Sequence, residues 1–258
     1  MSQPAFSALA PLPFELVYSD GEPLETEWHV WELNLLLELF QQAMAEQGRT
    51  DFYVGGNMFV YYSEQQAREV WEEEMKRRQK KTAFRGPDVF WVGGVSPHQR
   101  KAWVSWEEDW RLPDVIIELL SPKTAKKDRT KKKDLYQDVF RTAEYFLHDP
   151  DEETLEGFRL VGSSYQPIPP DREGRLWSEQ LGVSFGFWKG TVKGKTYPWL
   201  RLFRPDGHLV PTEGEAEGQR ADAEHRRADA ERQRADAAEA ELARLRALLA
   251  ERTPPESA

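Results

Sequence analysis

Cysteine is absent from the 258 residues of this chain. Its absence excludes disulfides and thiolate metal sites, and it fits a protein of the reducing cytoplasm. Long apolar stretches are missing too, because none approaches the roughly 20 residues that cross a bilayer. The first residues, MSQPAFSALAPLPFELV, lack the basic start and apolar run of a signal peptide. We therefore expect a soluble, cytoplasmic protein with no membrane association.

Histidine is scarce and scattered. The five residues show no HxxxH or HxH spacing: His29, His98, His148, His208 and His225. The absence of such spacing argues against a zinc centre. With neither thiolates nor clustered imidazoles, a metal site would be built from carboxylates and would take a hard cation such as Mg²⁺ or Mn²⁺.

Positive charge is in deficit, with a formal net charge of −10. This argues against broad, non-specific adhesion to nucleic acid, which needs an extended basic surface. The basic residues concentrate in two runs, each of which is either a solvated face or a phosphate-binding surface. The runs comprise Lys76, Arg77, Arg78, Lys80, Lys81 and Arg85, and then Lys123, Lys126, Lys127, Arg129, Lys131, Lys132 and Lys133.

An α+β domain is predicted over residues 25–210, after an irregular, proline-rich arm at 1–24. Apolar residues at three- to four-residue spacing predict helices, and runs rich in β-branched and aromatic residues predict strands. The first three strands after the second helix should form an antiparallel meander. The predicted helices cover about 25–47, 64–80 and 129–142, and the predicted strands 52–62, 88–92, 101–106, 114–120, 144–149 and short segments of 154–210.

Residues 211–258 differ in composition and repeat with a seven-residue period. One heptad position is occupied by alanine and then leucine: Ala221, Ala228, Ala235, Leu242 and Leu249. Alanine makes a thin seam, so this segment should associate weakly. The sequence leaves open a coiled coil with a partner or second copy, a lone solvated helix, or disorder.

Two carboxylates stand out as candidates for chemistry. Asp88 opens the DVFWV strand directly after Gly86-Pro87, and Glu118 lies inside the apolar strand VIIELL. A buried carboxylate is costly unless it is paired, protonated or bound to metal. Acids at one edge of a sheet can hold a divalent ion for phosphodiester hydrolysis. We therefore expect Asp88 and Glu118 to meet at neighbouring strand ends.

Such a site also needs a cation, and the strand does not supply one. Side chains alternate along a strand, so position 120 shares the face of Glu118, and this position is leucine. In the helix that follows, Lys132 lies three residues before Leu135 and four before Tyr136, on the predicted apolar face. Lys132 is thus the favoured candidate, with Lys123 as the competitor.

Four ordered strings together resemble the Uma-type endonuclease family of the PD-(D/E)XK, restriction-endonuclease-like superfamily. They are RGPDVFWV (85–92), PDVIIELLSPKT (113–124), DRTKKKDLYQDVFRTAEYFLHDP (128–150) and GFRLVGSSYQPI (157–168). The resemblance covers roughly residues 25–210. It implies a restriction-endonuclease-like core, a central mixed β-sheet flanked by helices, with Asp88 and Glu118 as catalytic, metal-binding acids.

The resemblance also implies roles for residues outside the acid pair. The usual E-x-K is absent, as in relatives whose lysine has moved to the next helix, and D-x-x-x-K-x-x-x-Y falls on Asp128, Lys132 and Tyr136. His29 and Glu27 lie where the family tends to place a polar residue of the first helix facing the site, although a histidine on a helix face is more often structural.

Two functions follow as hypotheses. The first is an endonuclease that uses Mg²⁺ or Mn²⁺ at Asp88 and Glu118, with Lys132 as catalytic cation and DNA as the expected substrate. Its flanking phosphates would contact Lys123, Lys126, Lys127, Arg129 and Lys131. The alternative is a catalytically weak or inactive nuclease fold that binds or oligomerises through its C-terminal helix.

Overall fold

The structure, a computed structural model, describes residues 12–19, 26–76 and 83–252. Most of the predicted arm and the centre of the first basic run (77–82) lie outside the described residues. The chain divides into two compact units, residues 1–210 and 211–258. No helix in the described part of the chain combines the length and the apolar character needed to cross a membrane.

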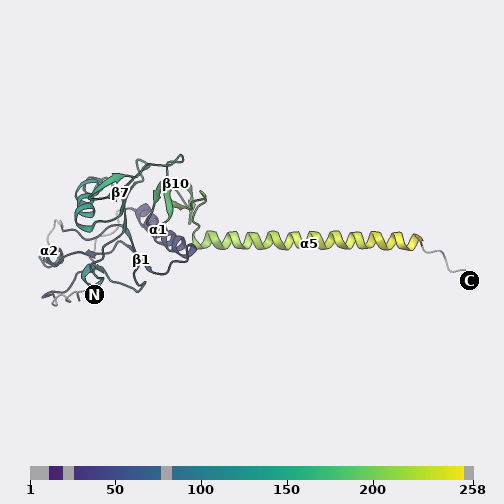
Figure 1. Ribbon diagram of the computed structural model, residues 1–258, viewed down its shortest axis with the longest axis horizontal. Coiled ribbons are helices and arrows are strands. Elements are labelled where there is room, and N and C mark those ends of the chain that lie inside the picture. The colour runs from purple at the N-terminus through teal and green to yellow at the C-terminus, as the bar shows by residue number, and fades with distance from the viewer. Residues whose placement is uncertain (1–11, 20–25, 77–82, 253–258) are drawn as a thin grey trace, which may run out of the picture. The chain divides into compact units, whose positions relative to one another are not determined.

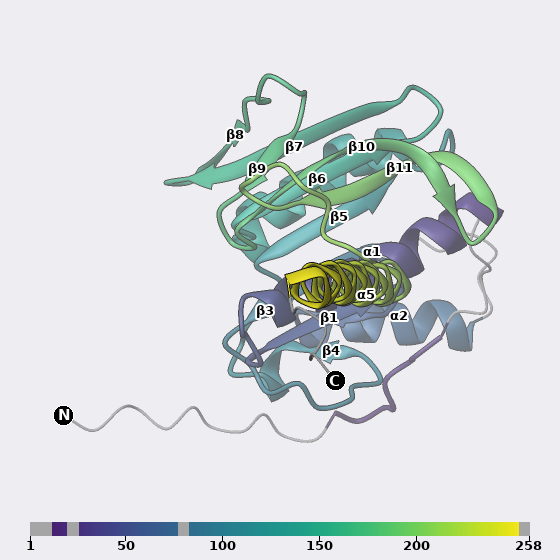
Figure 2. The ribbon, with the colours of Figure 1, turned by 90° about the vertical axis from the view of Figure 1, so that its right-hand side faces the viewer.

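The first unit is built on a mixed sheet of six strands (Figures 1 and 2). Neighbouring strands are antiparallel except for β5 and β6, which run parallel. The order across the sheet is β1 (Phe52–Gly56), β3 (Val89–Gly93), β5 (Val115–Leu119), β6 (Glu144–Asp149), β7 (Thr154–Val161) and β8 (Ser164–Pro167). The central mixed sheet expected from the sequence is present.

The predicted antiparallel meander is wrong, because β3 pairs directly with β5. The run at 101–106 forms only β4 (Trp103–Val104) and a 3₁₀ turn, η1 (Ser105–Glu107). β4 lies outside the main sheet and pairs in parallel with β2 (Val60–Tyr61). This pairing joins segments about 40 residues apart, which local sequence pattern does not reveal.

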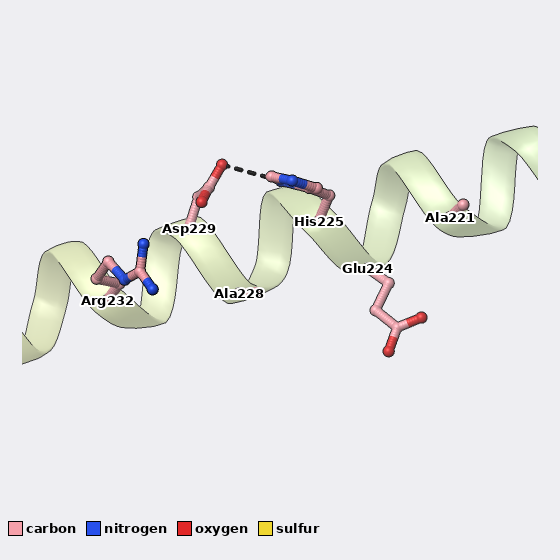
Figure 3. Close-up of a pocket in the computed structure, with 6 residues that line it drawn as sticks. All are labelled: Ala221, Glu224, His225, Ala228, Asp229 and Arg232. Atoms are coloured by element: carbon pink, nitrogen blue, oxygen red, sulfur yellow. Dashed lines mark hydrogen bonds and ion pairs between the residues drawn. The ribbon is translucent and has the colours of Figure 1, made fainter.

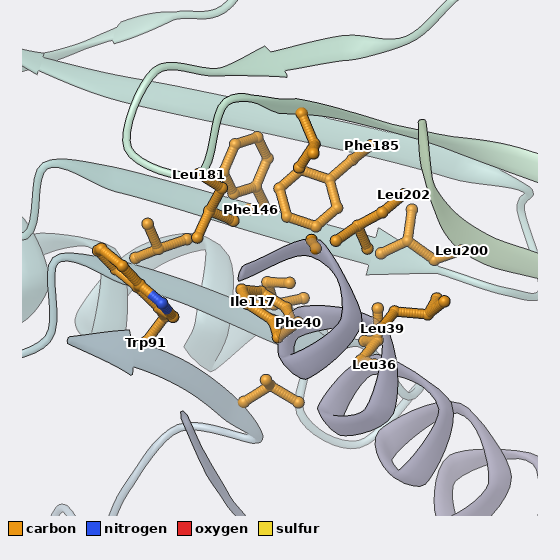
Figure 4. Close-up of a cluster of buried hydrophobic side chains, with 14 of the residues drawn as sticks. Leu36, Leu39, Phe40, Trp91, Ile117, Phe146, Leu181, Phe185, Leu200 and Leu202 are labelled. Atoms are coloured by element: carbon orange, nitrogen blue, oxygen red, sulfur yellow. The ribbon is translucent and has the colours of Figure 1, made fainter. Parts of the chain in front are cut away.

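One face of the sheet is covered by α1 (Glu27–Glu46) and by a second, three-stranded antiparallel sheet. Leu36, Leu39 and Phe40 of α1 lie in the same buried cluster as Ile117 and Phe146 of the main sheet (Figure 4). The second sheet has the order β11 (Lys195–Phe203), β10 (Val183–Val192), β9 (Leu176–Ser178). Its Phe185, Leu200 and Leu202 complete the cluster.

The opposite face is covered by a helix over residues 125–140, called the site helix below. It alternates α and π turns: α3 (Ala125–Lys127), η2 (Asp128–Lys132), α4 (Lys133–Leu135) and η3 (Tyr136–Phe140). Its Tyr136 and Phe140 pack with Ile116 and Leu120 of the β5 segment. A shorter helix, α2 (Glu64–Met75), begins at Ser63, whose hydroxyl accepts the Gln66 N–H.

The second unit contains one helix, α5 (Glu213–Arg252), of 40 residues, about 60 Å long at the usual rise per residue. In the described part of the tail, residues 213–252 form a helix, which is one of the alternatives that the sequence left open. Figure 3 shows one exposed stretch, in which His225 and Asp229 pair at 3.2 Å. Leu242, Leu245 and Leu248 are about half exposed.

Candidate active site

Asp88 lies at the start of β3, where chain geometry fixes its backbone. The N–H of Asn57 donates to the Asp88 carbonyl at 2.8 Å. Gly86, two residues earlier, passes so close to the Met58 carbonyl that a Cβ at this position would lie 2.1 Å from its oxygen. Any larger residue would push the segment away, so the glycine permits the close approach of this segment to Met58.

Strand register brings Asp88 to Glu118. β3 and β5 pair antiparallel with Val89 opposite Ile117. Continuing this register by one residue places Asp88 opposite Glu118, where cross-strand side chains are close neighbours. Each carboxylate accepts a hydrogen bond from the backbone of the facing segment. The Leu119 N–H donates to Asp88 Oδ2 at 2.7 Å, and the Asp88 N–H donates to Glu118 Oε2 at 3.4 Å.

Glu118 is fully buried, and side chains of the site helix contact both of its oxygens. The Tyr136 hydroxyl donates to Oε1 at 2.6 Å, and the Lys132 ammonium donates to Oε2 at 2.8 Å. Lys132 also lies 3.0 Å from Oδ1 of Asp128, which is buried as well. Lys132, the favoured candidate, is therefore a lysine that contacts the predicted acid.

The π turns explain how Asp128, Lys132 and Tyr136 can act together. In a regular α-helix of 3.6 residues per turn, residues four apart drift around the axis by about 40°. A π turn is wider, so a mixture of α and π turns lowers this drift and keeps every fourth residue on one side. The site helix thus presents Asp128, Lys132 and Tyr136 toward the same edge of the sheet.

Burial and charge set the ionisation of the group. Burial raises the pKa of Glu118 to about 8, against the Lys132 ammonium, which lowers it. Burial lowers the pKa of Lys132, but the carboxylates of Glu118, Asp128 and Asp88 outweigh burial and hold that pKa above its usual range. Lys132 is therefore cationic at physiological pH.

The pKa values of Asp88 and Tyr136 are shifted in opposite directions. Burial raises the pKa of Asp88, but the His29 imidazole, the Lys132 charge and the Leu119 N–H together bring this pKa below its usual value. Burial, reinforced by Glu118, holds the pKa of Tyr136 well above its usual range. Asp88 is thus ionised, while Tyr136 remains a hydrogen-bond donor.

Of the two residues considered on the first helix, only His29 faces the acids. Its Nε2 lies 3.5 Å from Asp88 Oδ1, and its side chain is 9% exposed. Thr26 caps α1 by accepting the His29 N–H, which fixes the start of the helix beside β3. Glu27 points elsewhere and pairs with Lys195 at 2.6 Å.

The donor set of the site fits a divalent metal ion in chemistry. Asp88 and Glu118 lie opposite each other at the ends of β3 and β5, and their side chains carry carboxylate oxygens, which are the ligands that hard cations prefer. Nevertheless, no group of three or more histidine, aspartate or glutamate side chains has a metal-binding arrangement in the parts of the chain that the structure describes. The Lys132 ammonium contacts Glu118 and Asp128, so its positive charge offsets charge on these buried acids.

The predicted nucleic-acid-binding residues lie on and before the site helix. Lys123, Lys126, Lys127 and Lys131 are exposed. Arg129 is instead engaged by Glu156 at 2.8 Å and by Asp149 at 3.5 Å. In the first basic run, Lys76 and Arg85 pair with acids of α2, at Glu72, Glu73 and Glu74.

Three contacting residues were not ranked as site residues from the sequence. Asp128 and Tyr136 appeared only as positions of a motif spacing, and His29 appeared as a structural histidine. The i, i+4, i+8 pattern of Asp128, Lys132 and Tyr136 was the available signal for the first two. For His29 no local signal distinguishes a residue that contacts the acids from a core residue.

Comparison with known proteins gives a family. A putative nuclease of the DUF820 group from Anabaena variabilis is similar in structure, with a TM-score of 0.40 and 14% identity, covering 64% of this chain and 81% of that one. No curated protein matches the sequence. Residues 5–193 match the model of Uma2, described as putative restriction endonuclease. Because the match spans most of the sequence, this chain belongs to the Uma2 putative restriction endonuclease family.

Proposed function

We propose that this protein is a metal-dependent endonuclease that hydrolyses phosphodiester bonds of DNA. The observation that carries the proposal is the meeting of Asp88, Glu118 and Lys132 at the ends of β3 and β5. Membership of a restriction endonuclease family supports the reaction class. The choice of Mg²⁺ or Mn²⁺ as the ion, and of DNA over RNA, belongs to the proposal.

In this mechanism Asp88 and Glu118 would hold the ion, which supplies an activated water and electrostatic stabilisation of the phosphate. The Leu119 N–H fixes the Asp88 carboxylate, and Tyr136 fixes that of Glu118. Lys132 would orient the attacking water or offset the negative charge that develops on the phosphoryl group. This lysine fills the role that a strand lysine at position 120 would have.

Substrate binding would use the exposed lysines around the site helix. Phosphate contacts do not distinguish one base sequence from another, but they fix the position of the nucleic-acid strand on the protein. The lysines that would make these contacts are Lys123, Lys126, Lys127 and Lys131. Arg129 was predicted to join them. Its contacts with Glu156 and Asp149 would have to break first, so we rank it below the lysines.

The test is cleavage of plasmid DNA, single-stranded DNA and RNA with Mg²⁺ or Mn²⁺. Glu118→Gln should abolish cleavage, while Glu152→Gln, the same change at an exposed turn residue, should leave it intact. Calorimetry should show Mn²⁺ binding that Asp88→Asn removes. Equal cleavage by the wild-type and Glu118→Gln proteins would attribute the activity to a contaminant and refute the proposal.

A second proposal concerns the tail. Leu242, Leu245 and Leu248 are about half exposed on α5, and this favours association with a second copy through residues 211–258. This association is the core of the alternative function, a non-catalytic binding or oligomerisation module. A cytoplasmic location is likewise proposed, on the cysteine-free composition.

A further inference from the structure

The hairpin formed by β10 and β11 carries positive charge and no acidic residue of its own. Although the chain has a net charge of −10, residues 183–203 contain three lysines, one arginine and neither aspartate nor glutamate. The lysines lie toward the tip of the hairpin, whose last paired residues are Val192 and Lys195. They are Lys189, Lys193 and Lys195, called the hairpin lysines below.

The tip of this hairpin is a tight, regular turn. Lys193 and Gly194 connect the strands, and both have a positive φ, of 47° and 79°. Two-residue turns with two such residues follow the natural twist of paired strands. Lys193 is therefore an exposed lysine on a well-defined hairpin and not on a long loop.

The hairpin reaches the edge of the main sheet that holds the acid pair. β5 and β6 run parallel, so Glu118 near the end of β5 lies at the edge where β6 ends and β7 begins. Lys189 Nζ lies 2.9 Å from Oε2 of Glu153, the residue directly before β7. These two side chains are 70% and 48% exposed. An ion pair this exposed contributes little to stability, so a phosphate can take the place of Glu153.

Lys195 anchors the hairpin on the same side of the molecule. Its Nζ lies 2.6 Å from Oε1 of Glu27, in the first turn of α1. His29 of that turn lies beside Asp88. Figure 2 shows the end of the hairpin next to the start of α1. Lys195 thus positions the hairpin, and the other two hairpin lysines are the candidates for contact with a ligand.

We propose that Lys189 and Lys193 form a second phosphate-binding surface, which contacts the backbone of a DNA duplex. The inference rests on the proposed function, in which DNA is the substrate. The second sheet covers the α1 face of the main sheet, whereas the site helix covers the opposite face. The two lysine-bearing surfaces therefore flank the acid pair from opposite faces, and a duplex held by both would be cut within its length.

The test measures binding of a fluorescein-labelled DNA duplex by anisotropy at several salt concentrations, with metal chelated so that no cleavage occurs. In the full chain carrying both Lys189→Gln and Lys193→Gln, affinity should fall. The slope of log affinity against log salt concentration should decrease by about 2, because each lost phosphate contact removes about 0.9.

The matched control carries Arg111→Gln and Arg141→Gln. It removes the same charge just before β5 and β6, at the sheet edge opposite to the acid pair, and its slope should equal that of the wild-type protein. In the wild-type protein, bound duplex should also protect Lys189 and Lys193 from chemical acetylation, which mass spectrometry detects without any variant.

Three results would overturn the inference. Unchanged acetylation of both lysines, or equal slopes for the lysine variant and the wild-type protein, would remove the hairpin as a DNA contact and leave the acid site and the site-helix lysines in place. A wild-type protein that binds no DNA would refute the proposed substrate together with this second surface.

Discussion

At position 118 a carboxylate occupies a strand that is otherwise apolar, and two side chains of one helix hold its oxygens. Neither contact is local, because Tyr136 is 18 residues from Glu118 and Lys132 is 14. The result is a carboxylate with a single orientation. Such preorganisation is what a metal ligand needs, since an ion gains little from a side chain that must first be ordered.

Tyr136→Phe tests this orientation. The change removes the hydroxyl that donates to Glu118 Oε1 and leaves a buried acceptor unsatisfied, which should cost about 1–3 kcal/mol of unfolding free energy. Cleavage activity should fall by about 10- to 100-fold, as for other outer-shell partners of metal ligands. Chemical denaturation and nuclease assays measure the two effects.

The matched control is Tyr165→Phe. Tyr165 is also buried, and its hydroxyl donates to the Thr142 carbonyl at 3.1 Å, away from Glu118. This variant should lose stability but keep its activity. Equal activity losses in the two variants would mean that Tyr136 acts through folding alone.

How far the site could be predicted depended on whether a residue conflicts with its surroundings. Glu118 was visible because a carboxylate is out of place in an apolar strand, and Lys132 because helical spacing aligned it with Tyr136. His29 conflicts with nothing in its segment. Its significance depends on its distance from Asp88, 59 positions along the chain, and pattern within one segment carries no such information.

At the scale of elements, Lys132 ties the site helix to β5. It is the cation for Glu118 and for Asp128, both of which are buried. Breaking a buried ion pair by removing one partner is far more costly than losing a surface pair.

Lys132→Met should therefore lower the free energy of unfolding by about 3–5 kcal/mol and abolish cleavage. Methionine preserves most of the side-chain volume, so the loss reports charge more than packing. The neighbouring Lys131→Met is the control, because Lys131 is exposed and its substitution should change stability by less than about 0.5 kcal/mol. Similar unfolding curves for both variants would contradict the pairing.

The elements themselves were predictable where one periodicity dominates. The predicted helix at 25–47 corresponds to α1, and the predicted strand at 144–149 has the bounds of β6. The segment at 101–106 was misplaced, because its partner β2 is distant in sequence. The π turns of the site helix were not predicted either, because the spacing of its apolar residues was compared only with the repeat of an α-helix.

At the scale of the whole molecule, stability should depend on pH through His148. Burial lowers the pKa of His148 from 6.5 to about 4. Between these values the unfolded chain binds a proton that the folded protein does not, so this residue makes stability fall as the pH decreases. The loss should reach up to about 3 kcal/mol near pH 4.

Protonation of Glu118 changes the free energy of unfolding with pH in the opposite direction over part of this range. The effect of His148 is therefore measured as the difference between a variant and the wild-type protein. The free energy of unfolding of His148→Leu, minus that of the wild-type protein, should rise steadily from pH 7.5 to pH 4. His98→Gln, at an exposed histidine, should show no such trend. A difference that is independent of pH would show that His148 is not protonated on unfolding.

Association through α5 can be separated from folding of the first unit. The core cluster on the α1 face of the sheet ends with Val210, so truncation after this residue should leave the melting temperature unchanged. Light scattering should give a mass above the 30.0 kDa of one chain for the full protein, and one-chain mass for the truncated protein.

Leu245→Asp should have the same effect on mass as truncation, because it places a charge on the leucine side of α5. Ala240→Asp, on the other side of the helix, is the control and should leave the mass unchanged. A full-length protein with the mass of one chain would refute self-association.

The balance of charge around Glu118 has a consequence for how the protein is handled by a cell. With the Lys132 ammonium already in contact with the buried acids, folding does not have to wait for an ion. Under the proposed function, newly made chains would fold before they bind the ion and would gain activity only when it binds. Chelators should then silence such an enzyme without unfolding it, and a rise in metal supply should switch it on.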